Sequence, residues 1–348
     1  MKTNNKDLPL DQFIELALYD KADGYYMKKN PFEKEGDFIT YPNITRVFSE
    51  IIAIWVVTFW KSLGSPKKFN LLELGAGNGE MMKVIIETLK NFPECYLNCN
   101  FQIHEKSELL KKKQQLNLKS EKITWIEDVK INNSYPTIFL ANEFFDALPI
   151  KQFFKKKEVW VERFVHFKEK AEFKEQPADI KKIEQNLNFT ISKEQEVIEY
   201  SPGSFEYLKN ICNLIKKNGG GILIIDYGYL DLKMHETLQA IKNHKHSNIL
   251  EDIGDSDITY NINFSLFKKF TEQFDELDSI ISNHKKFLTS MGIVQRAEII
   301  SENIPFSEKS DLFYRIRRLI DEKQMGELFK VMLIKKKNNK FKTGFEID

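Results

Sequence analysis

The chain has 348 residues, of which 42% are hydrophobic and 30% are charged, a composition typical of a globular protein with a sizeable core. Its 52 basic and 51 acidic residues leave a formal net charge of +1, which gives no general electrostatic reason to bind nucleic acid or an anionic membrane. Three cysteines are too few for a disulfide framework, so we expect reduced thiols, no metal site and a cytoplasmic location.

The first part of the chain predicts two helices, over residues 10–19 and 44–62, joined by a loop rich in glycine, proline and aromatic residues. The first residues lack the basic-then-apolar pattern of a targeting segment. The most apolar run, residues 51–60, would span only ~15 Å as a helix, about half the hydrocarbon thickness of a bilayer. It therefore predicts a buried helix and no membrane insertion.

From residue 69 onward, short apolar runs alternate with segments of helical spacing. Helices are expected over residues 80–90 and 106–119, and the runs that predict strands are FNLLELG, FQIHE, ITWIED and TIFLANEFF. Strands that alternate with helices indicate βαβ units and a parallel sheet.

The second half predicts a hairpin, a further strand–helix unit and a closing strand. KQFFKKKEVWVERFVHFKEK alternates like an antiparallel hairpin, GILIIDYG is a buried strand after a helix, and 229–300 is irregular. A helix near 307–326 precedes the strand FKVMLIKK. The expected division is an N-terminal helical lid region (1–65), a core (66–150, 200–230 and 300–348), a hairpin insertion (151–199) and a substrate-side insertion (231–299).

The stretch LLELGAGNGE places Gly75, Gly77 and Gly79 directly after the first predicted strand of the sheet. Glycines at this density let the backbone turn tightly and approach a ligand closely. A P-loop requires a lysine and then a serine or threonine after its glycines, and this chain has neither there. The G-x-G-x-G spacing also differs from the G-x-G-x-x-G of the dinucleotide-binding fingerprint. Glu73 would repel a pyrophosphate, but it suits a ligand with a cationic amino group.

This pattern resembles the first motif of class I S-adenosylmethionine methyltransferases, in which the methionine end of the cofactor lies over the glycine turn. The resemblance implies a Rossmann-like, doubly wound α/β fold and places the cofactor's ammonium near Glu73. Glu105, at the end of the next strand, is the expected acceptor for both ribose hydroxyls. Glu127 and Asp128 follow the third strand, and either could meet the adenine amine.

Further motifs resemble the MidA family, whose mitochondrial member is a complex I assembly factor that methylates arginine. They are Gly24-Tyr25-Tyr26, Gly36-Asp37-Phe38-Ile39-Thr40-x-Pro42, Phe48-x-Glu50, Asn142-Glu143-Phe144-Phe145-Asp146-Ala147-Leu148-Pro149, Ser201-Pro202, Asp226-Tyr227-Gly228, His244-Lys245 through Asp257-Ile258-Thr259, and Met325-Gly326-Glu327. The resemblance covers roughly residues 8–334 and departs from the family pattern at Tyr41, Asn78 and Asn263. Inserted α+β elements on the substrate side are expected beside the core.

The acceptor site is expected after the fourth strand, where Asn142, Glu143 and Asp146 would lie at the carboxyl edge of the sheet. Carboxylates there could hold a guanidinium through bidentate hydrogen bonds and could help to remove its proton. Glu143 and Asp146 would point to one side if the segment formed a helical turn. The alternative is that Asp146 caps a turn and Glu143 alone meets a ligand.

Further candidates lie on the substrate side and in the N-terminal loop. Asp226 and Tyr227 end the fifth strand and are expected to line or support the acceptor pocket. His244 matches a histidine of the family on the substrate side. Gly36 and Asp37 belong to a loop that resembles a lid over the cofactor.

The leading hypothesis is an enzyme that transfers a methyl group from S-adenosyl-L-methionine to arginine of a protein. The resemblance implies symmetric dimethylation of an NADH dehydrogenase (complex I) subunit, in support of its assembly. A methyltransferase acting on a small molecule or another nucleophile is the alternative enzyme. A non-catalytic assembly chaperone that binds the cofactor is the alternative of another class.

Overall fold

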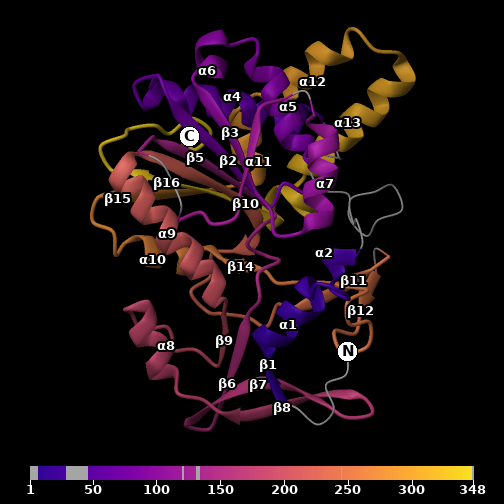
Figure 1. The fold of residues 1–348 in the computed structure, drawn as a ribbon, viewed down its shortest axis with the longest axis vertical. Helices are drawn as coiled ribbons and strands as arrows, with labels where there is room; N and C mark the ends of the chain where they lie inside the picture. The colour runs from indigo at the N-terminus through magenta and orange to yellow at the C-terminus, as the bar shows by residue number, and fades with distance from the viewer. Residues whose placement is uncertain (1–6, 29–45, 120, 131–133, 244, 347–348) are drawn as a thin grey trace. The chain divides into compact units, whose positions relative to one another are not determined.

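The computed structural model describes residues 7–28, 46–119, 121–130, 134–243 and 245–346 (Figure 1). Contacts divide the chain into two compact units. Unit 1 comprises Met1–Phe38, Phe145–Lys209 and Leu230–Phe270, and unit 2 comprises Ile39–Phe144, Asn210–Tyr229 and Thr271–Asp348. Unit 2 contains the glycine turn and the strands predicted around it.

Seven strands of unit 2 form a sheet in the order β15-β16-β10-β5-β2-β3-β4. They are β2 (Phe69–Leu74), β3 (Cys99–His104), β4 (Ile123–Ile126), β5 (Thr137–Asn142), β10 (Gly220–Tyr229), β15 (Leu277–Asn283) and β16 (Phe329–Lys336). Neighbours from β10 to β4 pair in parallel, whereas β16 is antiparallel to both β10 and β15. The predicted α/β sheet is confirmed, and the carboxyl ends of its parallel strands share one edge.

Unit 2 also contains helices between and around these strands, of which those near 44–62, 80–90, 106–119 and 307–326 were predicted from the sequence. They are α4 (Arg46–Ser62), α5 (Glu80–Leu89), α6 (Pro93–Leu97), α7 (Glu108–Asn117), α11 (His284–Ser290), α12 (Ile293–Ser301), α13 (Phe306–Ile320) and the turn η1 (Glu322–Gly326). The apolar run 51–60 lies within α4, where Trp55 and Phe59 are fully buried in the core of the unit. Within the described ranges, no helix is both long and apolar enough to span a membrane.

Unit 1 is built around an antiparallel sheet in the order β1-β7-β6-β9, with β8 on β7. The pairing of β6 with β7 confirms the predicted hairpin. The elements of this unit are β1 (Asp7–Pro9), α1 (Leu10–Tyr19), α2 (Tyr25–Lys28), β6 (Lys151–Lys156), β7 (Val159–Phe167), β8 (Ala171–Pro177), α8 (Ile180–Leu187), β9 (Val197–Tyr200), β11 (Gln239–Lys242), β12 (Lys245–Ser247), β13 (Asp257–Thr259) and β14 (Ile262–Asn263). Helices α9 (Pro202–Asn218) and α10 (Phe264–Thr271) each begin in unit 1 and end in unit 2.

The structure differs from the sequence-based expectation in two places. Residues 229–300 are not irregular, because they contain five strands and three helices among the described residues. Four of these five strands have only two to four residues, which leaves little room for an alternating pattern. The units also cut the expected domains differently, since α4 and residues 271–299 belong to unit 2.

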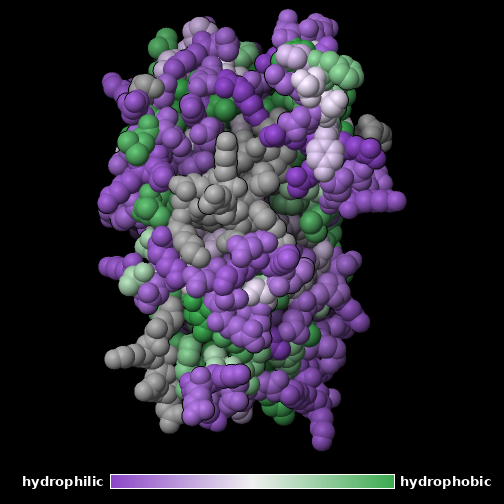
Figure 2. Space-filling view, turned by 90° about the vertical axis from the view of Figure 1, so that its right-hand side faces the viewer, coloured by the Kyte–Doolittle hydropathy of each residue, from purple (hydrophilic) through white to green (hydrophobic). Residues whose placement is uncertain are grey.

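The surface seen in Figure 2 is mainly hydrophilic, and its hydrophobic side chains form small separate groups. This distribution suits a chain in which 30% of the residues are charged.

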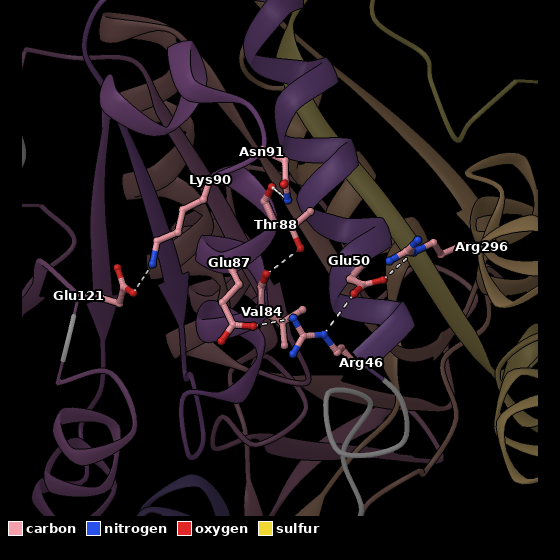
Figure 3. Close-up of polar contacts among 9 residues, drawn as sticks. All are labelled: Arg46, Glu50, Val84, Glu87, Thr88, Lys90, Asn91, Glu121 and Arg296. Atoms are coloured by element: carbon pink, nitrogen blue, oxygen red, sulfur yellow. Dashed lines mark hydrogen bonds and ion pairs between the residues drawn. The ribbon is translucent and has the colours of Figure 1, made fainter. Parts of the chain in front are cut away.

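A chain of ion pairs connects α4, α5 and α12 within unit 2 (Figure 3). The Glu50 carboxylate accepts from Arg46 Nε at 3.2 Å and from Arg296 Nε at 2.8 Å. Arg46 Nη2 also donates to Glu87 at 2.5 Å. The Glu50 side chain is 12% exposed, and its bond to Arg296 joins α4 to α12, while Arg46, on the same helix as Glu50, joins α4 to α5 through Glu87.

Glu50→Gln should lower the free energy of unfolding by ~1–3 kcal/mol, the usual cost of weakening hydrogen bonds between charged groups at a buried site. Urea denaturation would measure this loss. Glu87→Gln is the matched control: its side chain is 35% exposed, so its pair with Arg46 should be worth less than about 1 kcal/mol. Equal losses in the two variants would contradict a special role for Glu50.

Candidate functional site

The glycine turn connects the end of β2 to the start of α5. Gly75, Gly77 and Gly79 have φ angles of 66°, 53° and 85°, all in the left-handed region that side chains disfavour. A Cβ on Gly75 would lie 2.9 Å from the ring of Phe144, so even one added carbon would force that ring to move. The Gly75 N–H donates to the carbonyl of His104 at 2.9 Å, which ties the turn to the end of β3.

Glu73 is buried in β2, directly before this turn, with 3% of its surface exposed. Burial, and secondarily the nearby charge of Glu105, raises its pKa to about 8. Its Oε2 atom is buried and accepts no hydrogen bond from the described part of the chain. A buried acceptor of this kind lacks a donor, and a cationic amino group would supply one.

Glu105 follows β3, and several hydrogen bonds hold its carboxylate. Its Oε1 accepts from the N–H of Ser107 at 2.9 Å, and its Oε2 accepts from Nε2 of Gln114 at 3.0 Å. Burial raises its pKa to about 7. Each carboxylate oxygen has a second lone pair, so the group can still accept from two hydroxyls. Its assignment to the ribose stays a prediction.

Gln114 and Trp125 were not singled out in the sequence. Gln114 is fully buried on α7, where Nε2 also donates to the carbonyl of Gly77 at 2.8 Å. Its Oε1 accepts from Trp125 Nε1 at 2.9 Å. The sequence signal for Gln114 is weak, because a glutamine in a lysine-rich helix normally lies in solvent.

Glu127 and Asp128 follow β4, the strand next to β3. Glu127 is exposed, whereas Asp128 is half-buried and accepts from the N–H of Lys130 at 2.8 Å. The structure places both side chains after the predicted strand. The choice between them as the adenine contact stays open.

Asn142 and Glu143 lie at the carboxyl end of β5, between β2 and β10. Glu143 has a φ of 49°, which is uncommon for any residue other than glycine. Its N–H donates to Ile225 of β10 at 2.9 Å, and its Oε1 accepts from Asn142 Nδ2 at 3.3 Å. Asn142 Oδ1 is buried and accepts no hydrogen bond from the described residues. Strained backbone of this kind occurs preferentially at functional sites.

The glycine turn and the Asn142–Glu143 segment are neighbours in the sheet. Leu74 pairs with Ala141, so the next residue of each strand, Gly75 and Asn142, begins its loop at the same level. The contact between Gly75 and the ring of Phe144 joins the two loops. The predicted cofactor turn and the predicted acceptor residue therefore meet at one edge of unit 2.

Asp226 and Tyr227 lie near the carboxyl end of β10, one and two residues beyond the pairing of Ile225 with Asn142. Asp226 is fully buried, and its carboxylate accepts from the N–H of Tyr227 at 3.0 Å. The Tyr227 ring contacts Phe329 edge-on at 5.3 Å between centroids. Both residues lie at the predicted edge, and their role at the acceptor stays a prediction.

Asp146 belongs to unit 1, whereas Glu143 belongs to unit 2. The helical turn that would align the two side chains is not formed: Glu143 is left-handed, and the next turn closes from Leu148 N–H to Phe145 O at 3.2 Å. Asp146 is 5% exposed, and its carbonyl accepts from the N–H of Tyr260 at 3.3 Å.

Three predicted residues, Gly36, Asp37 and His244, lie outside the residues that the structure describes. Among those that it does describe, no group of three or more histidine, cysteine, aspartate or glutamate side chains is placed to hold a metal ion. The donor set at the edge of unit 2 consists of carboxylates and amides, which suits an organic ligand with amino and hydroxyl groups.

Comparisons with known proteins identify the family of the chain. A family model for S-adenosyl-L-methionine-dependent methyltransferases matches residues 51–282. The chain is 27% identical over 348 residues to the mitochondrial protein arginine methyltransferase NDUFAF7 of Homo sapiens, covering 91% of this chain and 78% of that protein. It is 28% identical over 352 residues to the NDUFAF7 protein of Danio rerio, covering 91% of this chain and 81% of that protein.

A solved structure shares the fold. The crystal structure of a superfamily member from Burkholderia thailandensis, bound to S-adenosyl-homocysteine, superposes with a TM-score of 0.79 at 20% identity, covering 94% of this chain and 88% of that one. The orphan acceptor of Glu73 and the left-handed glycines fit such a cofactor. The matched residues 51–282 make up more than half of the chain and include the glycine turn and Glu143. The chain therefore belongs to the family of S-adenosyl-L-methionine-dependent methyltransferases, and S-adenosyl-L-methionine is its cofactor.

Proposed function

We propose that the protein transfers a methyl group to an arginine side chain of a protein substrate, with Glu143 holding the guanidinium. The observation that carries the proposal is the conformation of Glu143, a half-buried carboxylate in a left-handed backbone at the edge that also holds the glycine turn. A glutamate is kept in such a conformation only when the surrounding structure imposes it. Its hydrogen bonds to Asn142 and Ile225 are part of that structure.

The chemistry of arginine explains why a carboxylate is needed. A guanidinium is protonated and delocalised, so it is a poor nucleophile. Glu143 could accept hydrogen bonds from the nitrogens that do not react and favour positive charge on them. The unpartnered Oδ1 of Asn142 would accept a further N–H at the same place. The cofactor supplies the methyl group, and these residues orient the nitrogen that receives it.

The finer assignment follows from the relatives and from the resemblance to the MidA family. The relatives from Homo sapiens and Danio rerio are named protein arginine methyltransferases, which supports a protein partner. We extend the proposal to symmetric dimethylation of an NADH dehydrogenase subunit in support of its assembly. Asp146, Asp226, Tyr227 and His244 are the further residues proposed on the substrate side.

Labelled-methyl transfer tests the proposal. The purified protein is incubated with methyl-labelled S-adenosyl-L-methionine and a bacterial lysate, and the labelled protein is digested and analysed by mass spectrometry. We expect label on dimethylated arginine of a protein. Label confined to small molecules would favour the alternative enzyme, whereas cofactor binding without any transfer would favour a non-catalytic chaperone.

Affinity for S-adenosyl-homocysteine should rise between pH 6 and pH 8. In the free protein the pKa of Glu73 is about 8, and that of Glu105 is about 7. A bound ammonium and bound hydroxyls favour the ionised carboxylates, so binding below these pKa values must release protons. The affinity can change by up to about tenfold per pH unit for each proton released.

Isothermal titration in buffers of different ionisation enthalpy measures both the affinity and the protons released. Glu73→Gln should weaken binding at pH 8 and flatten the dependence on pH, because the amide does not titrate. A wild-type affinity that is constant from pH 6 to pH 8 would show that these two carboxylates do not meet the cofactor.

A further inference from the structure

The buried face of α7 joins two parts of the cofactor site through a single amide. Gln114 Nε2 donates to Gly77 O at 2.8 Å and to Glu105 Oε2 at 3.0 Å, while its Oε1 accepts from Trp125 Nε1 at 2.9 Å. Two of these partners are acceptors and the third is a donor. Only one orientation of the amide satisfies all three, so the network fixes the side chain.

The same helix holds the glycine turn at two further points. Asn117 Nδ2, three residues along α7, donates to the carbonyl of Asn78 at 2.8 Å. A Cβ on Gly79 would lie 3.1 Å from the side chain of Leu118, so the turn packs closely against this end of the helix. Two successive carbonyls of the turn, those of Gly77 and Asn78, are thus directed toward α7.

This anchoring has a consequence for the opposite side of the turn. In a trans peptide the C=O and N–H groups point in opposite directions. Fixing the Gly77 carbonyl on Gln114 therefore directs the N–H of Asn78 away from α7. One side chain sets the orientation of a backbone donor and the position of the Glu105 carboxylate at the same time.

We propose that Gln114 is a positioning residue for the cofactor, which it controls through Glu105 and the glycine turn. The inference rests on the assignment of Glu105 to the ribose. A ligand that spans the turn and Glu105 needs both at a set separation, and small displacements of such groups weaken binding strongly. Gln114 is fully buried and satisfied by protein groups. A substitution of Gln114 should therefore change the affinity for the cofactor through Gly77 and Glu105, the groups that it holds.

The dependence on pH separates positioning from simple packing. The hydrogen bond from Gln114 favours the ionised form of Glu105, so its removal raises the pKa of Glu105. The titratable groups around Glu105 are Glu73 on β2, His104 and Lys106 beside it in sequence, and Asp128, which interacts with His104. A substitution of Gln114 leaves all of these titratable residues in place. The loss of affinity should therefore be larger at pH 6.5 than at pH 8.5.

Titration calorimetry with S-adenosyl-homocysteine tests the proposal on four proteins. They are the wild type, Gln114→Met, Trp125→Phe and the control Gln115→Met, which makes the same change at the next, exposed residue of α7. We expect Gln114→Met to bind about 10- to 100-fold more weakly at pH 6.5 and to recover part of the loss at pH 8.5. Trp125→Phe, which removes only the donor to Gln114 Oε1, should lose about 3- to 10-fold. Gln115→Met should bind like the wild type.

Each result decides the question. Wild-type affinity in Gln114→Met, or a loss equal at both pH values, would overturn the positioning role. If Gln114→Met does not fold, as judged by circular dichroism, Trp125→Phe carries the test, and its undiminished affinity would overturn the role. A wild-type protein that fails to bind S-adenosyl-homocysteine would instead remove the cofactor assignment on which the inference depends.

Discussion

Glu143→Gln should lower the single-turnover rate of methyl transfer by ~10²–10³-fold while leaving the affinity for S-adenosyl-homocysteine within about twofold of the wild type. Magnitudes of this order are typical when a charged group that acts on the reacting centre is neutralised. Glutamine keeps the size of the side chain and one acceptor oxygen. It loses the negative charge that would favour a guanidinium.

The local structure makes this substitution a selective one. The φ of 49° is a property of the backbone, and its conformational free-energy cost is about the same for glutamine as for glutamate. The backbone bond from residue 143 to Ile225 does not involve the side chain, and an amide oxygen can still accept from Asn142. Loss of turnover in Glu143→Gln would therefore report the missing charge and not a rearranged loop.

The measurement needs an acceptor peptide or the intact partner subunit, single-turnover rates and a parallel cofactor titration. Glu194→Gln is the control, because this exposed glutamate also has a left-handed backbone, with a φ of 62°, is not among the proposed site residues and should not affect the rate of transfer. Asp146→Asn should show a smaller loss than Glu143→Gln if it only supports the pocket. Normal turnover in Glu143→Gln would exclude the guanidinium role, and a matching loss of cofactor affinity would move the residue to the cofactor pocket.

The parallel sheet could be predicted because its strands are strongly apolar. β2 and most of β5 and β10 are buried on both faces, so their sequences are nearly continuous hydrophobic runs, which are easy to recognise. The short strands β11 to β14 carry no such signal: they have two to four residues, too few for a period to appear. They are defined by their pairing with residues distant in the chain.

At the site, too, features set by neighbouring residues in the sequence could be predicted, whereas features set by contacts between distant segments could not. The glycine turn could be predicted, because closely spaced glycines indicate a backbone that other residues cannot easily adopt. The role of Gln114 could not, because it depends on contacts with Gly77, Glu105 and Trp125, which come from three other segments. The left-handed backbone of Glu143 could not be predicted either, since glutamate has no preference for that conformation.

Gly77→Val should abolish the rise in melting temperature that S-adenosyl-homocysteine produces in the wild type. Gly77 has a φ of 53° and lies in the turn that is predicted to hold the cofactor, so a branched side chain would strain the backbone and is expected to occupy ligand space. Ligand at a hundredfold excess over Kd stabilises a native protein by ~2.7 kcal/mol, and a hundredfold loss of affinity removes most of this. NAD should produce no shift in either protein.

Backbone strain alone must be separated from loss of the site, and Gly64 offers the matched control. Gly64 has a φ of 85° in the connection after α4, and a Cβ there would meet nothing within 4 Å. Gly64→Val therefore introduces comparable strain with free space around it and away from the glycine turn. We expect it to lower the melting temperature of the free protein and to keep the full ligand-induced rise. A full rise in Gly77→Val would place the cofactor elsewhere, whereas loss of the rise in Gly64→Val would attribute the effect to general destabilisation.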